Sequence, residues 1–296
     1  MRGKIIKGVS GFYYVYSFEN AHVYTCRAVG KLRDKKIKPL VGDNCKFDVL
    51  DDDTLEGSLS DIIQRRNTLI RPAVANVDQM LVIFAVNDPK PNFYLLDKFL
   101  FFIMHERLRP ILVFNKEDLG LEEKQEIIDI YRGFDAPLIF TSAKENINVD
   151  TVKELLKGNT TAVAGPSGVG KSTLINAIVG SDIMETGDIS KKTLRGKHTT
   201  RHTEMFEFDV DGTESFILDT PGFSSFYLPT LDEQERASDY YPEFEEYSPR
   251  CRFNACLHDR EPDCMVKKAV EEGNISRERY ENYLKILKEI KNSYKY

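Results

Sequence analysis

The octapeptide GPSGVGKS at residues 165–172 decides the fold, because it matches the pattern G-x-x-x-x-G-K-S. The run TTAVA at 160–164 precedes it and is typical of a buried strand, and a helical pattern, STLINAIV, continues it through residue 179. In such a loop, glycines let backbone N–H groups turn inward around phosphates, and the helix N-terminus adds partial positive charge. The stretch therefore predicts a nucleoside triphosphate site within an α/β domain.

Two residues of this loop and a later string are expected to handle the phosphates and the metal. Lys171 reaches the β- and γ-phosphates in loops of this type, and the Ser172 hydroxyl ligates Mg²⁺. DTPG at 219–222 follows the strand-like run ESFIL. An Asp at that place binds Mg²⁺ through water, and the glycine can present its N–H to the γ-phosphate. Alone, D-x-P-G is a common turn, but about 50 residues after a phosphate loop it is the expected companion.

The strings NKED at 115–118 and TSAK at 141–144 predict that the base is guanine. The Asp118 carboxylate can accept hydrogen bonds from guanine N1–H and its 2-amino group, and Lys116 can lay its aliphatic stem against the ring. TSAK follows after enough chain for one helix and one strand, and its loop supports the guanine O6. Because both strings precede residue 165, whereas Ras-like GTPases carry them last, the domain is expected to be circularly permuted.

The rest of the chain divides into segments that differ in composition and in the pattern of their apolar residues. Residues 1–68 hold short Tyr-, Val- and Phe-rich runs between turn signals, which favours a small all-β, OB-like barrel. Strand and helix patterns alternate from 69 onward, including helical patterns at 93–108 and 122–134, and Asp211-Gly212 signals a hairpin within 203–219. After about 226 the chain is polar and helical. We therefore expect a multidomain protein.

Four metal-ligating residues gather in a short stretch near the C-terminus. The spacing Cys251-x4-Cys256-x-His258-x5-Cys264 offers three thiolates and one imidazole, a set suited to tetrahedral Zn²⁺. No open coordination position is evident, which favours one structural zinc over a catalytic one. Cys26 and Cys45 lack such neighbours and are expected in a core.

Composition excludes several classes of protein. The 296 residues are 41% hydrophobic and 30% charged, which excludes a disordered chain, and no apolar run is long enough for a transmembrane helix. The N-terminus lacks the apolar core of a signal peptide, so a cytoplasmic location is expected, with no membrane as a partner. The net charge of −6 argues against a simple basic nucleic-acid binder. The segment Arg27–Lys46, however, contains seven basic residues and only two acidic ones. This segment is either a solvated surface or a patch that contacts phosphates.

With these motifs in view, the chain resembles the circularly permuted GTPases called ribosome small subunit-dependent GTPase A. The resemblance covers essentially the whole length and adds RRNTLIRPAVANVDQ (65–79), GKHTT (196–200), DTPGF (219–223) and AVEEGNISRERYENY (269–283). It implies an OB-fold RNA-binding domain at 1–68, a circularly permuted P-loop GTPase domain at 69–225 and a zinc-binding helical domain at 226–296.

The resemblance also implies an activity and its partners. The activity is slow GTP hydrolysis, stimulated by the small ribosomal subunit during late assembly of that subunit. The partners are then GTP or GDP, Mg²⁺ with the nucleotide, the small subunit and its rRNA, and we expect a monomer. The residues expected to bind GTP are Asn115, Lys116, Asp118, Thr141, Ser142, Ala143, Gly165, Pro166, Ser167, Gly168, Val169, Gly170, Lys171, Ser172, Thr173, Asp219 and Gly222.

The catalytic group has to replace a glutamine that this chain lacks. Phe223 stands where Ras-like enzymes carry a glutamine that orients water. We expect His198 to take that role, because it adjoins the candidate γ-phosphate loop and the matching histidine of the family has it; the alternative is contact with RNA or solvent. The family commonly has three threonines after this histidine, but here Arg201 takes the third place. Thr199 and Thr200 therefore both remain candidates for the Mg²⁺ and γ-phosphate contacts.

Two other functions are compatible with parts of the sequence. GPSGVGKS also resembles the phosphate loop of guanylate kinases, which do not need NKED, TSAK or DTPG. A GTP-dependent conformational switch that never turns over is the second alternative, since the glutamine is missing. Phosphate release with small subunits present separates the switch from the GTPase.

Overall fold

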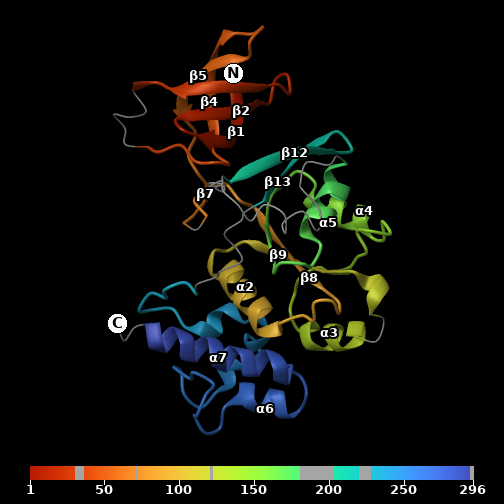
Figure 1. Ribbon diagram of the computed structural model, residues 1–296. Coiled ribbons are helices and arrows are strands. Elements are labelled where there is room, and N and C mark those ends of the chain that lie inside the picture. The colour runs from red at the N-terminus through yellow and green to blue at the C-terminus, as the bar shows by residue number, and fades with distance from the viewer. Residues whose placement is uncertain (31–36, 71, 121–122, 181–202, 220–227, 294–296) are drawn as a thin grey trace, which may run out of the picture. The chain divides into compact units, whose positions relative to one another are not determined.

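The computed structural model describes residues 1–30, 37–70, 72–120, 123–180, 203–219 and 228–293 (Figure 1). The chain forms two units, which are described separately below. The first comprises Met1–Met80, Val149–Ala164 and Lys171–Ser224. The second comprises Leu81–Asn148, Gly165–Gly170 and Ser225–Tyr296.

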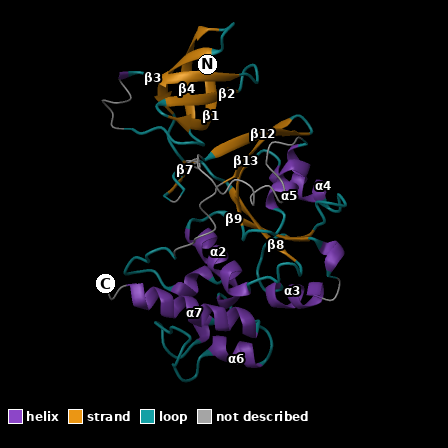
Figure 2. Cartoon of the chain, in the orientation of Figure 1, coloured by secondary structure: helices purple, strands orange, loops and turns teal. Residues whose placement is uncertain are grey.

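Five strands form the N-terminal barrel, and Figure 2 draws them, like all strands of the chain, in orange. The barrel closes because the strands pair in the order β1-β2-β3-β5-β4 and β4 pairs back with β1. Among the strand pairs in the described part of the barrel, only β3 with β5 is parallel. Its strands are β1 (Arg2–Val9), β2 (Phe12–Ser17), β3 (Val23–Ala28), β4 (Asn44–Asp51) and β5 (Glu56–Ile62).

The barrel has its own hydrophobic core, because alternate side chains of each strand point inward. Its buried members are Ile5, Val15, Tyr24, Cys26, Cys45, Phe47 and Leu59. The predicted OB-like barrel and the predicted core position of both isolated cysteines are thereby confirmed. A two-stranded ribbon, β6 (Thr68–Leu69) with β7 (Val74–Ala75), follows the barrel.

In its described residues, the rest of the first unit carries three further strands and two helices. β11 (Thr160–Ala164) is parallel to β13 (Thr213–Asp219), which is antiparallel to β12 (Glu204–Val210). The hairpin turns at Asp211 and Gly212, both with positive φ (48° and 76°), as the Asp-Gly signal predicts. The helices are α4 (Val149–Leu156) and α5 (Lys171–Val179). β12 also pairs antiparallel with β1 of the barrel.

The second unit holds the strands and helices that carry the predicted guanine strings. β8 (Gln79–Ala85) is buried along its whole length and begins in the first unit. β9 (Arg109–Asn115) lies between β8 and β10 (Leu138–Phe140) in the strand order, and β10 is parallel to β9. The helices are α2 (Phe93–His105) and α3 (Glu123–Tyr131).

Both helices are shorter than their sequence patterns predict. α2 starts at an N-cap, Asn92, whose side chain accepts a 3.0 Å hydrogen bond from Leu95 N. It ends at His105 rather than at 108, because Arg107 has a φ of 55°, which lies outside the helical region. The pattern at 122–134 likewise overestimates α3 at its C-terminal end, because Tyr131 is its last helical residue.

The C-terminal part of the second unit is helical, as expected. Short 3₁₀ turns, η3 (Ala237–Tyr240), η4 (Pro242–Phe244) and η5 (Ser248–Arg250), lead to α6 (Met265–Glu271) and α7 (Arg277–Ser293). Figure 1 shows α7 beside α2, where Lys98 Nζ lies 2.7 Å from Glu289 Oε1. The core beneath α7 includes Tyr241, Phe244 and Tyr283. Within the described ranges, no helix combines the length and apolar character needed to cross a membrane.

Candidate functional site

The loop Gly165–Gly170 has a backbone that requires its glycines. Gly165 has a φ of 141°, and a Cβ there would lie 2.1 Å from the Ile83 carbonyl oxygen, so no side chain fits. Gly170 has a φ of 88°, and its Cβ would lie 2.4 Å from Asn115 Nδ2. The loop thus approaches β8 and the end of β9 so closely that only glycine is tolerated at both of its ends.

Asn115 connects the phosphate loop to the guanine strings. Its Nδ2 donates to Val169 O (2.9 Å), while its Oδ1 accepts from Ala143 N (3.0 Å) and from the Thr141 hydroxyl (3.2 Å). The side chain is buried, and both its polar atoms have partners. Three segments that are far apart in the sequence therefore meet at one amide in the second unit.

The two residues expected to touch the base follow Asn115. Lys116 adopts a left-handed backbone conformation (φ 62°, ψ 38°), and its Nζ donates to Asp88 O at 2.6 Å. This turn opens the 3₁₀ helix η1 (Glu117–Leu119), in which Asp118 is exposed to solvent. Glu117 N donates to Thr141 O (2.9 Å), which joins the NKED turn to the TSAK turn. The turn is fixed by the hydrogen bonds of Lys116 and Glu117. It presents the carboxylate of Asp118 to solvent, where a ligand can reach it.

The other predicted nucleotide residues belong to the first unit or lie outside the described residues. Lys171, Ser172 and Thr173 form the first turn of α5, where the positive end of the helix dipole favours an anion. Asp219 is the last residue of β13, and its backbone pairs with Val163 of β11. The predicted site residues that lie outside the described residues are His198, Thr199, Thr200 and Gly222.

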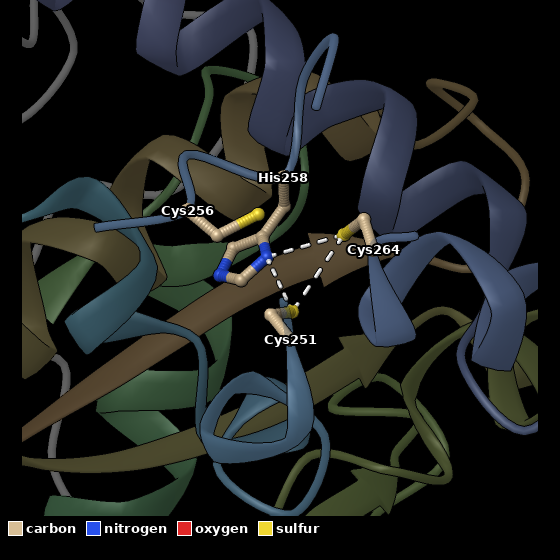
Figure 3. A group of neighbouring side chains, drawn as sticks. All are labelled: Cys251, Cys256, His258 and Cys264. Carbon is tan, nitrogen blue, oxygen red and sulfur yellow. Dashed lines mark hydrogen bonds between the residues drawn. The ribbon is translucent and has the colours of Figure 1, made fainter. Parts of the chain in front are cut away.

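The predicted metal ligands come together in the second unit (Figure 3). One ligand atom each from Cys251, Cys256, His258 and Cys264 lies within 4.8 Å of every other. Cys251 Sγ lies 3.9 Å from Cys264 Sγ, and His258 Nδ1 lies 3.4 Å from Cys264 Sγ. Two sulfurs each bound about 2.3 Å from a tetrahedral zinc lie about 3.8 Å apart. The set therefore has the donors and the spacing for a structural Zn²⁺.

Surrounding groups orient these ligands. The ring of His258 points Nδ1 at the thiols, and its Nε2 lies 3.2 Å from the Ser248 hydroxyl, a contact that fixes the ring orientation. Burial lowers the pKa of His258, which keeps the imidazole in the neutral form that binds metal. From α7, Tyr280 and Tyr283 donate through their hydroxyls to His258 O and Leu257 O. The metal loop, residues 251–264, therefore packs against α7.

Sequence reasoning missed a buried charge network in the same unit. Arg279 of α7 donates to Asp97 of α2 (2.5 Å) and to Glu243 (2.7 Å), and all three side chains are buried. Tyr131 and Asn282 complete the hydrogen bonds to Asp97. The only signal was a charge inside the apolar run of α2, since Asp97 lies between the buried residues Leu96 and Phe99.

Comparisons with known proteins agree with this geometry. The family described as RsgA GTPase matches residues 62–229, and the RsgA N-terminal domain family matches residues 2–57. A protein of Agathobacter rectalis named "Small ribosomal subunit biogenesis GTPase RsgA" is 49% identical, with 100% of each chain covered. A protein of the same name from Alkaliphilus metalliredigens is 44% identical over 100% of this chain and 99% of its own length.

Solved structures match over nearly the whole chain. The crystal structure of YjeQ from Thermotoga maritima has a TM-score of 0.81 and 34% identity, and covers 98% of both chains. YloQ, which its title calls a circularly permuted GTPase, has a TM-score of 0.79 and 34% identity over 99% of this chain and 95% of its own. At such identity and coverage, the likeness extends to sequence as well as fold.

Proposed function

The chain belongs to the RsgA GTPase family, and from this membership we propose that it hydrolyses GTP in the biogenesis of the small ribosomal subunit. The observation that carries the proposal is the bonding of Asn115 to both the phosphate loop and the TSAK loop. That arrangement supports one nucleotide lying across the three segments. The names of the similar proteins supply the partner, the small subunit.

We propose a division of labour among the nucleotide residues. Asp118 reads the base, Lys116 covers one face of its ring, and Ala143 offers a backbone N–H to the guanine O6. The backbone of Gly165–Gly170 surrounds the phosphates, Lys171 neutralises them, and Ser172 ligates Mg²⁺, the ion that the GTPase family implies. The remaining proposed contacts are Asn115, Thr141, Ser142, Thr173, Asp219 and Gly222.

Catalysis is assigned to His198, with Thr199 and Thr200 as the candidates for γ-phosphate and Mg²⁺ contacts. Phe223 cannot orient water, and an imidazole can accept or donate a proton near neutral pH. His198→Ala should lower the subunit-stimulated kcat about 10²-fold, while the affinity for GTP stays within a few-fold. Lost GTP binding would place His198 in the ground-state site instead, and an unchanged kcat would remove it from catalysis.

The barrel is proposed to contact rRNA. A hollow of about 270 Å³ on its surface is lined by aromatic, aliphatic and basic groups that suit a stacked base and a phosphate: Gly11, Tyr13, Arg27, Ala28, Ile37, Lys38 and Pro39. The Arg27 guanidinium stacks over Phe12, 4.6 Å from its ring centre. Arg27→Glu with Lys38→Glu should weaken subunit binding and flatten its salt dependence, whereas Lys268→Glu on α6 should not.

These assignments give each part of the chain a role. We propose an RNA-binding domain at 1–68, a GTPase domain at 69–225 and a zinc-binding helical domain at 226–296, in a cytoplasmic monomer. Zinc would hold the last domain through Cys251, Cys256, His258 and Cys264 and take no part in hydrolysis. The function is tested by phosphate release from GTP with purified small subunits; the absence of stimulation would reject it.

A further inference from the structure

Four neighbouring strands of the first unit are joined by one line of paired residues. Lys7 of β1 lies opposite Glu204 of β12, which lies opposite Asp219 of β13, which lies opposite Val163 of β11. Lys7 belongs to the barrel, Asp219 opens the DTPG motif, and Val163 lies two residues before Gly165. We call these four paired residues the cross-strand line.

The first step of the cross-strand line is also an ion pair. Lys7 Nζ lies 2.8 Å from Glu204 Oε1, and both side chains are partly exposed. Lys7 Nζ also lies 5.9 Å from the centre of the Tyr14 ring. An exposed pair adds little stability. Its position matters more, because it lies where β12 begins, at the end of the hairpin that carries Asp219.

A second contact attaches the barrel further along the same hairpin. Lys4 is buried, its Nζ donates to the Thr160 hydroxyl (3.1 Å) and it lies 5.0 Å from the centre of the Phe216 ring. Tyr16 meets that ring edge-on at 5.6 Å and donates to Glu214 (3.1 Å). The barrel therefore contacts the hairpin at two places, at Glu204 and at Phe216. Because of these two contacts, we expect a rotation of the barrel to move the hairpin with it.

The hairpin itself is suited to transmit such a movement. β12 and β13 pair without a break in register from Glu204–Asp219 to Val210–Thr213. A continuously paired antiparallel ribbon resists shear, because sliding by one residue would turn every side chain to the opposite face. A displacement at Glu204 is therefore passed to the backbone of Asp219 rather than absorbed between the strands.

We propose that Lys7 is a positioning residue, which acts through Glu204 to couple the barrel to Asp219 so that a small subunit bound to the barrel accelerates GTP hydrolysis. This inference rests on the proposed function. It differs from a direct role of Lys7 in RNA binding, which would change the affinity for the subunit and leave the maximal rate unaltered.

The test is a charge swap in the full chain. Lys7→Glu, Glu204→Lys and the double variant are compared with wild type for basal hydrolysis and for kcat and KM at increasing small-subunit concentration. Arg2→Glu, a charge reversal on the same strand opposite Lys46 of β4, is the matched control. Each single variant should lower the stimulated kcat about fivefold or more with basal hydrolysis within about twofold, and the double variant should restore it.

Each other outcome has a distinct meaning. Single variants with wild-type stimulation would overturn the coupling, and so would a double variant that fails to recover. A change confined to the KM for subunits, or an equal loss in Arg2→Glu, would make Lys7 an RNA contact and overturn it as well. A wild-type protein that the subunit does not stimulate would reject the proposed function itself. Because both side chains are partly exposed, folding is expected to survive, and thermal unfolding checks this.

Discussion

The side-chain amide of Asn115 donates a 2.9 Å hydrogen bond to the carbonyl oxygen of Val169. The first residue of the guanine string thereby holds the phosphate loop, and its other atom, Oδ1, accepts from Ala143 N. Base recognition and phosphate binding share one buried side chain. Substitutions that test base choice should therefore leave Asn115 intact and change the exposed Asp118 instead.

Asp118→Asn should change the preferred base. The carboxylate that accepts two hydrogen bonds from guanine becomes an amide, so GTP affinity should fall by about 2–4 kcal/mol. Xanthosine triphosphate should gain affinity, because its 2-oxo group can accept from the amide. Equilibrium binding of both nucleotides measures this. Glu117→Gln is the control, because Glu117 is paired with Lys124 (2.9 Å). Unchanged GTP affinity in Asp118→Asn would reject the guanine assignment.

The protein should carry one zinc per chain, held by the four C-terminal ligands. Cys256→Ser should remove the metal and unfold the segment around the metal loop, because structural zinc supplies much of the folding energy of a small module. GTP binding should stay within a few-fold. Elemental analysis and limited proteolysis report the two effects, with Cys26→Ala in the barrel as a variant that keeps its zinc. Freshly purified protein without metal would contradict the zinc site.

Stability should rise with pH on account of Lys4. Burial lowers the pKa of Lys4 to about 8, against 10.5 for an unperturbed lysine. Between these values the unfolded chain binds more protons than the folded chain, so raising the pH favours folding, by about 3 kcal/mol at most. Denaturant unfolding of wild type and Lys4→Met from pH 7 to 10 measures the difference.

The comparison with Lys4→Met is needed because other groups oppose this trend. Burial raises the pKa of Cys26 to about 11 and that of Cys45 to about 12, so these thiols favour unfolding as the pH passes 9. Both proteins contain the thiols, so most of their contribution cancels in the difference, because the Lys4 charge is the weakest of the influences on the pKa of Cys45. Parallel pH profiles for the two proteins would show that Lys4 has an ordinary pKa.

Arg279→Met should destabilise the second unit strongly. It leaves Asp97 and Glu243 buried without a counter-charge, a change that costs about 3–5 kcal/mol. Adding Asp97→Asn should recover part of the loss, because burial already raises the pKa of Asp97 and a neutral amide is cheaper to bury. Lys98→Met is the control, since Lys98 pairs with the more exposed Glu289. Chemical denaturation compares the variants, and equal stability of all four would contradict this account.

The features that the sequence could predict are those determined by residues close together in the chain. The phosphate loop was predictable because GxxxxGKS places glycines where Gly165 and Gly170 leave no room for a Cβ. The metal site was predictable because four strong ligands fall within one short stretch. The hairpin turn followed from Asp211-Gly212, whose positive φ values only a few residue types accept readily.

The contacts that sequence reasoning missed are long-range. Arg279 and Asp97 are 182 residues apart, and Lys7 and Glu204 are 197 apart. Nothing in the pattern around an isolated Arg or Lys shows which distant carboxylate it meets, because strand register and helix packing decide that. The ends of α2 and α3 were misjudged for a related reason: apolar periodicity continues beyond the point where the backbone leaves the helix.

Whether the small ribosomal subunit stimulates GTP hydrolysis is tested by the rate of phosphate release from GTP, measured with the full chain alone, with purified small ribosomal subunits and with large subunits. We expect slow release from the chain alone and no acceleration with large subunits. With small subunits we expect release to be about tenfold faster or more, which corresponds to a barrier lower by at least about 1.4 kcal/mol. Equal rates in all three mixtures, with GTP bound normally, would show that the protein is not a GTPase stimulated by the small subunit and would reject the proposed function.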